Sequence, residues 1–199
     1  MLNFSDRINL AIRIAVRAHQ GQYRKGSDTP YIAHPFAVAM ISQQFLEDED
    51  LFIAALLHDV LEDVPQWAYS RDDIRRDFGD EVLAIVEDVS EPLVDGANFQ
   101  AWLTRKDSYI RQISQTTNPK SILVSVSDKI HNMSEILREY SEKGDAVWQN
   151  FHVDKGREIW FFEEVFAAVQ HKPELPAAAI ERYKNLLNQL KQLDDRSQH

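Results

Sequence analysis

Residues 51–63 read LFIAALLHDVLED. Every residue from Leu51 to Leu57 is apolar, and we predict a largely buried helix from about Asp50 to Leu61. The apolar run is far too short to span a bilayer. A histidine and several carboxylates follow it directly, where uncompensated charge would be expensive. This stretch therefore indicates both the fold class and the position of the candidate chemistry.

Helical periodicity extends outward from this stretch in both directions. Apolar residues at positions 8, 11, 12 and 15 predict a first helix from about Asp6 to His19, and Pro35 begins a second that reaches about Phe45. No segment alternates apolar and polar residues, so we predict almost no sheet and an all-α, single-domain bundle over residues 1–199. Further helices are expected near residues 72–78 (capped by Asp72 or Asp73), 81–89, 102–115, 119–140, 154–170 and 174–193, with loops at 21–31 and 91–98.

The composition is that of a globular protein. Of the 199 residues, 44% are hydrophobic and 27% are charged, which excludes an intrinsically disordered chain. The chain has no cysteine, so a metal ion must be held by histidine and carboxylate, and a disulfide scaffold is excluded. Charged residues at positions 6, 7, 13 and 17 interrupt the apolar run that a signal peptide needs, so we expect no signal peptide here. We expect a cytoplasmic protein.

The charge balance restricts the class of partner. The formal net charge is −10, with a sequence pI of about 5.1. An acidic surface argues against binding of long nucleic acids, which requires a row of phosphate contacts. A small anionic ligand is still compatible, because a few local cations and a metal ion can reverse the field inside one cleft.

His58 and Asp59 form the centre of the candidate site. His58 shares a helical face with Glu62, and Asp59 with Asp63, because each pair is four residues apart. Adjacent helical residues differ by roughly 100° about the axis, so His58 and Asp59 could both reach one metal ion. The alternative is a fraying helix end with solvated acids, and the pair taken alone leaves both interpretations open.

Two further residues favour a metal site. His34 stands directly before Pro35, so its direction is fixed by the helix entry, and Asp128 lies within an apolar helix. An alternative for Asp128 is a pairing with a buried lysine or arginine. Together with His58 and Asp59 they offer two imidazoles and two carboxylates, a set that suits a divalent ion of the Mn, Fe or Zn type.

The order of these motifs resembles the HD phosphohydrolase superfamily. More specifically, the chain is similar to the hydrolase domain of RelA/SpoT-type enzymes and to the stand-alone small alarmone hydrolases. An HD pair alone is short and promiscuous, but ordered stretches between about Ala11 and Asn132 carry the similarity together. They are residues 19–25 (HQGQYRK), 29–35 (TPYIAHP), 55–63 (ALLHDVLED), 78–82 (FGDEV), 102–110 (WLTRKDSYI) and 127–132 (SDKIHN).

The resemblance implies an HD-type bundle that hydrolyses ppGpp or pppGpp and removes the 3′-pyrophosphate to give GDP or GTP. It implies that one divalent ion, usually Mn²⁺, is held by His34, His58, Asp59 and Asp128. It also implies an acidic pair required for hydrolysis, Glu62 and Asp63. Substrate contacts are implied for Arg24, Lys25, Lys129 and Asn132, and more loosely for Lys155, Arg157 and Trp160.

Several neighbouring residues are assigned no role in the site. His131 is not expected as a fifth ligand, because it lies on a different arc of its helix from Asp128. Structural roles are expected for His19, Trp102, Arg105 and Lys106. The expected partner is a small-molecule nucleotide of the ppGpp class, with no nucleic acid and no membrane, and the oligomeric state is left open.

Two other functions compete with alarmone hydrolysis. The first is an HD-type nucleotidase or phosphatase that acts on another nucleotide, such as NADPH or a deoxynucleotide. The second is a non-catalytic nucleotide-binding module. Loss of a metal ligand or of the acidic pair would favour that module, and the sequence retains all of these residues.

Overall fold

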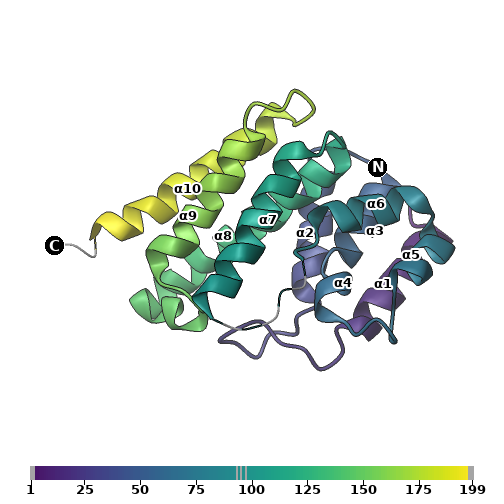
Figure 1. Cartoon of the computed structure of the whole chain (residues 1–199), viewed down its shortest axis with the longest axis horizontal. Helices are drawn as coiled ribbons and strands as arrows, with labels where there is room; N and C mark the ends of the chain where they lie inside the picture. Colours follow the sequence, from purple (N-terminus) through teal and green to yellow (C-terminus); the bar gives the residue numbers. More distant parts are fainter. Residues whose placement is uncertain (1–2, 93, 95, 97, 197–199) are drawn as a thin grey trace.

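The chain is an array of helices in the computed structural model, which describes residues 3–92, 94, 96 and 98–196 (Figure 1). The elements are α1 (Asp6–Ala18), α2 (Ala33–Gln43), α3 (Glu49–Leu57), α4 (Val60–Asp63), α5 (Arg71–Phe78), α6 (Asp80–Val89), α7 (Phe99–Gln115), α8 (Pro119–Lys143), the 3₁₀ helix η1 (Gly144–Asn150), α9 (Lys155–Val169) and α10 (Ala177–Arg196). Within the described residues, extended backbone pairs only at an isolated antiparallel bridge between Tyr23 and Pro30. The prediction of an all-α fold is therefore confirmed.

Helix α8 runs through the middle of the molecule and joins its two ends. Figure 1 shows α1 to α6 on the right of the view and α9 and α10 on the left, with α7 and α8 between them. Helix α8 contacts α2, α3, α6, α7, α10 and η1. Its residues from Ser121 to Ile130 are all buried, including the charged Asp128 and Lys129. Two charges at this depth require partners, which places a polar site inside the apolar core.

Side-chain caps fix where several helices begin. Ser5, Asp48, Asn98 and Asp154 each accept a backbone N–H from the first turn of their helix. Caps of this kind stabilise a helix by about 1 kcal/mol each. The expectation that Asp72 or Asp73 caps α5 is wrong.

Ser70 is the cap of α5, and Asp73 completes a capping box with it. The Ser70 hydroxyl accepts the Asp73 N–H, and the Asp73 carboxylate accepts the Ser70 N–H at 2.9 Å. The hydroxyl and the carboxylate thus satisfy each other's backbone donors. Further along, η1 was not predicted, and it forms part of the cavity wall described below.

The apolar stretch of residues 51–61 is not one continuous helix, contrary to the prediction. Helix α3 ends at Leu57 and α4 begins at Val60, so His58 and Asp59 lie at a break. The His58 ring bonds through Nδ1 to the Ala55 carbonyl at 2.8 Å. In a continuing helix that carbonyl would accept the Asp59 N–H instead. His58 and Asp59 keep helix-like backbone angles (φ −59°, ψ −34° and φ −90°, ψ −5°), so the break interrupts the hydrogen bonding rather than the direction of the chain.

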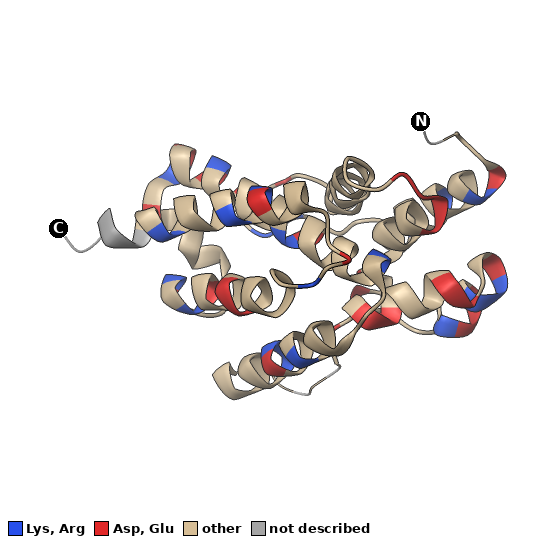
Figure 2. Cartoon of the chain, turned by 90° about the horizontal axis from the view of Figure 1, so that it is seen from above, with Lys and Arg blue, Asp and Glu red and all other residues tan. Residues whose placement is uncertain are grey.

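Charged residues of both signs are interspersed along the outer helices (Figure 2). On α5, for example, Arg75 and Arg76 pair with Asp72 and Asp73 three residues earlier. Such mixing differs from the basic stripe that a nucleic-acid surface requires. Among the described residues, none of the helices has both the length and the apolar character needed to cross a bilayer.

Candidate active site

A cavity of about 720 Å³ opens beside the break between α3 and α4. This volume is typical of sites for small molecules and cofactors. Its walls come from the loop before α2 and from α4, α7, α8, η1 and α9. The cations on these walls are Arg24, Lys25, Arg105, Lys106 and Lys129. The same walls carry eight acidic side chains, so the cations lie among carboxylates: Asp59, Glu62, Asp63, Glu91, Asp128, Glu135, Glu139 and Glu158.

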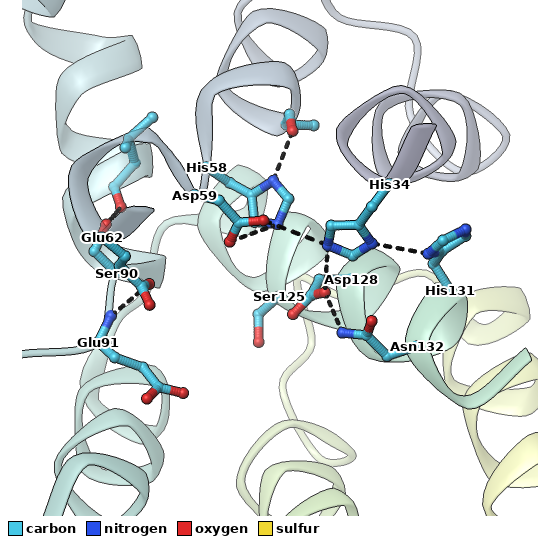
Figure 3. A network of polar contacts seen from close by, with 12 residues as sticks. His34, His58, Asp59, Glu62, Ser90, Glu91, Ser125, Asp128, His131 and Asn132 are labelled. Atoms are coloured by element: carbon cyan, nitrogen blue, oxygen red, sulfur yellow. Dashed lines mark hydrogen bonds and ion pairs between the residues drawn. The ribbon is translucent and has the colours of Figure 1, made fainter. Parts of the chain in front are cut away.

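Three side chains form a compact cluster at this cavity. One ligand atom from each of His34, His58 and Asp59 lies within 4.8 Å of the other two. His34 Nε2 is 3.5 Å from one Asp59 oxygen, and His58 Nε2 is 3.2 Å from the other. Figure 3 shows both rings converging on the carboxylate from α2 and from the end of α3. Asp128 adjoins the cluster, with Oδ1 3.2 Å from His34 Nε2.

The hydrogen bonds of His58 fit the role of a metal ligand. Its Nδ1 faces the Ala55 carbonyl at 2.8 Å, so Nδ1 carries the proton and donates. Its Nε2 is buried and, within the described part of the chain, has no hydrogen-bond partner. A buried nitrogen lone pair without a donor is costly, and a metal ion would satisfy it. The residues present therefore fit a divalent ion of the Mn, Fe or Zn type.

His131, which was not expected to be a ligand, orients the His34 ring as the Ala55 carbonyl orients His58. His34 Nδ1 lies 2.8 Å from His131 Nδ1. Burial lowers the pKa of His34, and it lowers the pKa of His131 to about 4, so both rings are neutral at pH 7. One ring must then donate, and donation by His34 leaves its Nε2 lone pair toward Asp59 and Asp128. His131 is thus placed as a support behind His34 (Figure 3).

Replacing His131 with alanine is expected to lower the affinity for Mn²⁺ by about 10- to 100-fold, the usual effect of removing such a supporting residue. Calorimetric titration of metal-free protein measures the affinity directly. His171→Ala is the matched control, since His171 is exposed and lines no part of the cavity. An unchanged affinity in His131→Ala would show that the 2.8 Å contact does not orient His34.

Asp128 pairs with a buried lysine, which is one of the two interpretations that its sequence allowed. Its Oδ2 accepts from Lys129 Nζ at 2.5 Å, and its Oδ1 accepts from Asn132 Nδ2 at 2.6 Å. Burial acts to raise its pKa, but the Lys129 charge and His34 hold the pKa of Asp128 well below its usual range. Asp128 is therefore ionised beside the His34 nitrogen, which is the state that a metal ligand requires.

The acidic pair lies on α4 and faces the cavity. One Glu62 oxygen accepts the backbone N–H of Glu91 at 2.7 Å, which fixes its direction (Figure 3). Burial, together with the Asp59 charge, raises the pKa of Glu62 well above its usual range and also raises the pKa of Asp63. Carboxylates with raised pKa values are suited to exchanging protons near neutral pH.

The first four expected substrate contacts all line the cavity: Arg24, Lys25, Lys129 and Asn132. Arg24 donates to Asn132 Oδ1 at 2.8 Å, and its guanidinium lies 5.6 Å from the centre of the Tyr31 ring. Tyr31 in turn donates from its hydroxyl to Asp59 at 2.7 Å. The residues expected to meet a nucleotide are thus connected to the residues expected to hold the metal.

The other three expected contacts do not line the cavity. Lys155 Nζ lies 2.5 Å from the Leu193 carbonyl. Arg157 pairs with Asp154 and lies 4.3 Å from the Phe99 ring centre, and the Trp160 ring lies 6.1 Å from that of Trp102. From the same helix, the cavity is lined instead by Glu158, Phe161 and Phe162.

The cavity is also lined by residues that were assigned no substrate or metal role from sequence. Trp102, Arg105 and Lys106, expected to be structural, are part of the cavity wall. Tyr31 stands three residues before His34, so the spacing alone could have predicted that the two side chains lie on the same side of the chain. Glu91 had no sequence signal, because its contribution to Glu62 is a backbone N–H.

Comparison with known proteins adds the evolutionary context. A family model described as HD domain matches residues 11–156. The chain is 36% identical over 141 residues to a GTP pyrophosphokinase of Streptomyces coelicolor, covering 68% of this chain and 16% of that protein. It is 37% identical over 125 residues to a guanosine-3′,5′-bis(diphosphate) 3′-pyrophosphohydrolase of Haemophilus influenzae, covering 60% and 17%. The chain thus spans under a fifth of the length of these two relatives.

Solved structures share the fold over most of their length. A metazoan ortholog of SpoT that hydrolyses ppGpp superposes with a TM-score of 0.74 at 21% identity, covering 95% of this chain and 98% of that one. A protein of Listeria monocytogenes EGD-e superposes with a TM-score of 0.66 at 27% identity, covering 82% and 99%. The helical arrangement around the cavity therefore recurs in independent structures.

Proposed function

Because the chain belongs to the HD domain family, we propose that it is a metal-dependent hydrolase that removes the 3′-pyrophosphate from ppGpp or pppGpp. The observation that carries the proposal is that two imidazoles and two carboxylates lie beside an acidic pair in one cavity, whose walls also carry five Lys and Arg side chains. A relative from Haemophilus influenzae bears the name of this activity, which supports the choice of substrate. The products would be GDP or GTP and pyrophosphate.

In this proposal His34, His58, Asp59 and Asp128 hold the divalent ion, and we infer Mn²⁺. When bound, such an ion lowers the pKa of water and polarises a phosphoryl oxygen. Glu62, held by the Glu91 N–H, orients the attacking water or takes its proton. The water oxygen bonds to phosphorus as the bond from phosphorus to the ribose 3′-oxygen breaks.

The leaving 3′-oxygen needs a proton, and in this proposal Asp63 supplies it. Asp63 lines the same cavity as Glu62, and its raised pKa allows it to carry a proton. Arg24, Lys25 and Lys129 then neutralise phosphate charge during transfer. Lys129 serves twice, because it also keeps Asp128 ionised.

A substrate panel tests the proposal. With added Mn²⁺ the protein should hydrolyse ppGpp faster than NADPH or GMP, as measured by product release. Arg24→Ala should lower kcat/KM for ppGpp by about 10- to 100-fold, the loss expected for hydrogen bonds to a charged group. Arg111→Ala is the control, because Arg111 is exposed on α7 and does not line the cavity.

Faster cleavage of NADPH or GMP, together with an Arg24→Ala variant unchanged toward ppGpp, would defeat the alarmone assignment. Whether the Arg24→Ala change affects KM or kcat is informative as well. A raised KM alone would mean that Arg24 binds ground state and transition state equally. A lowered kcat would mean that it meets charge developing on the transferred phosphorus.

A further inference from the structure

Glu158 is a buried acidic residue on the cavity wall that the proposed mechanism does not use. It lies in the first turn of α9, is 8% exposed, and borders the cavity. Among the described residues its carboxylate has no hydrogen-bond or ion-pair partner. Other acidic residues of this wall do have partners, since Glu91 binds Lys106 at 2.5 Å and Asp128 binds Lys129 at 2.5 Å.

The Glu158 oxygens border the cavity and, among the described residues, do not belong to the fully buried atoms that lack a partner, so they are open to whatever fills it. A carboxylate in such a position needs hydrogen-bond donors, which only the contents of the cavity can supply. Burial accordingly raises the pKa of Glu158, although the charges of Lys106 and Lys25 act to lower it. The lysines supply a favourable field, but none of them supplies a bonded donor. The missing donors are best supplied by whatever occupies the cavity.

The carboxylate of Glu158 itself fits a base better than a phosphate group. Phe161 and Phe162 follow at three and four residues on the same helix, so they share its face, and both border the cavity. Both rings are largely buried, and Lys106 Nζ lies 4.3 Å from the Phe161 ring centre, so they give this wall an apolar edge rather than an open stacking face. A carboxylate would repel phosphate, for which the cations of the cavity and the metal ligands are better suited.

We propose that Glu158 recognises guanine, accepting hydrogen bonds from N1–H and from the N2 amino group with its two carboxylate oxygens. The inference rests on the proposed function, since it places the base of the same substrate at the α9 wall. Guanine presents these two donors side by side on one edge. Adenine presents an acceptor at N1, which would face the carboxylate with a lone pair. Glu158 thus favours guanine nucleotides over adenine nucleotides.

Glu158→Gln tests the assignment in two assays. The first is the kcat/KM for ppGpp and for its adenine counterpart ppApp. The second is equilibrium binding of GDP and ADP in the presence of Mn²⁺, which requires no turnover. In each assay the wild type should prefer the guanine nucleotide. The variant should lose about 10- to 100-fold of that preference, because its kcat/KM or affinity falls for the guanine nucleotide and stays unchanged for the adenine nucleotide.

Glu163→Gln is the matched control, because Glu163 lies on the same helix, outside the cavity lining, and pairs with Lys191. Glu158→Gln should melt at or above the wild-type temperature, since it removes an uncompensated buried charge. An equal loss for GDP and ADP would overturn base recognition, as would a wild type that binds both equally. A Glu158-dependent preference for GDP without ppGpp hydrolysis would support this inference and defeat the proposed function. Hydrolysis of ppGpp with an unchanged guanine preference in the variant would overturn this inference and support the proposed function.

Discussion

Asp59→Asn is expected to lose the divalent ion and with it nearly all hydrolysis. Asp59 is the carboxylate on which both His34 and His58 converge, at 3.5 and 3.2 Å. Asparagine keeps the shape but removes the charge that binds a cation. Since the ion contributes several kcal/mol to stabilising the transition state, the rate should fall by about 10³-fold or more. Metal analysis of the purified variant and an assay with saturating Mn²⁺ measure the two effects separately.

The same variant should remain folded. An asparagine amide can donate to the bare Nε2 of His58 and can still accept from the Tyr31 hydroxyl, which lies 2.7 Å from Asp59. We therefore expect metal-free Asp59→Asn to melt no lower than metal-free wild type. Only the wild type should gain stability from Mn²⁺, by about 2.7 kcal/mol at a free concentration of 100 times Kd.

Asp107→Asn is the control for this change, because Asp107 is exposed on α7 and does not line the cavity. It should bind Mn²⁺ and hydrolyse ppGpp as the wild type does. Full activity in Asp59→Asn, or a wild type indifferent to a strong chelator, would refute the metal centre. Either result would leave the helical fold unaffected, since the core is apolar and independent of the ion.

The helices could be predicted from the sequence because their signal is local. A period of 3.6 residues and the capping residues are both visible within a short window. The break at His58 was missed, since it depends on a ring nitrogen taking the Ala55 carbonyl within an otherwise uninterrupted apolar run. Nothing in the composition of that run distinguishes a continuous helix from one that breaks at His58.

The proposed metal cluster, unlike the helices, depends on contacts between distant parts of the chain. His34, Asp59 and Asp128 are far apart in the sequence and meet only because α2, the α3–α4 break and α8 pack together. The residues alone allowed a metal site, and the resemblance to HD hydrolases gave the specific set. Their role as ligands stays a prediction, which the Asp59 variant tests.

The wall formed by α9 could not be placed from sequence. Four consecutive apolar residues, 159–162, leave the inward face of this helix ambiguous. The looser resemblance pointed to Lys155, Arg157 and Trp160, whereas Glu158, Phe161 and Phe162 line the cavity. A choice between these faces requires the packing of α9 against α7 and α10, which involves residues distant in the chain.

Glu62→Gln and Asp63→Asn should retain the ion and lose turnover. Neither residue belongs to the compact cluster of His34, His58 and Asp59. In Glu62→Gln the new amide oxygen could still accept the Glu91 N–H, so the 2.7 Å bond and the geometry of α4 should persist. Both amides, however, are unable to take up or release a proton at neutral pH. Loss of a general acid or base lowers the rate by about 10²–10⁴-fold.

The outcome separates proton transfer from metal binding. Glu181→Gln, an exposed change on α10, controls for the loss of one acidic charge and should leave both metal content and turnover unchanged. If Glu62 and Asp63 act in the same step, the double variant should lose little more than the worse single variant, because groups that work as a unit are not additive. Loss of the ion in both single variants would place the acidic pair in the coordination sphere. Unchanged turnover in both would remove them from the chemistry, and proton transfer would then have to come from another group lining the cavity.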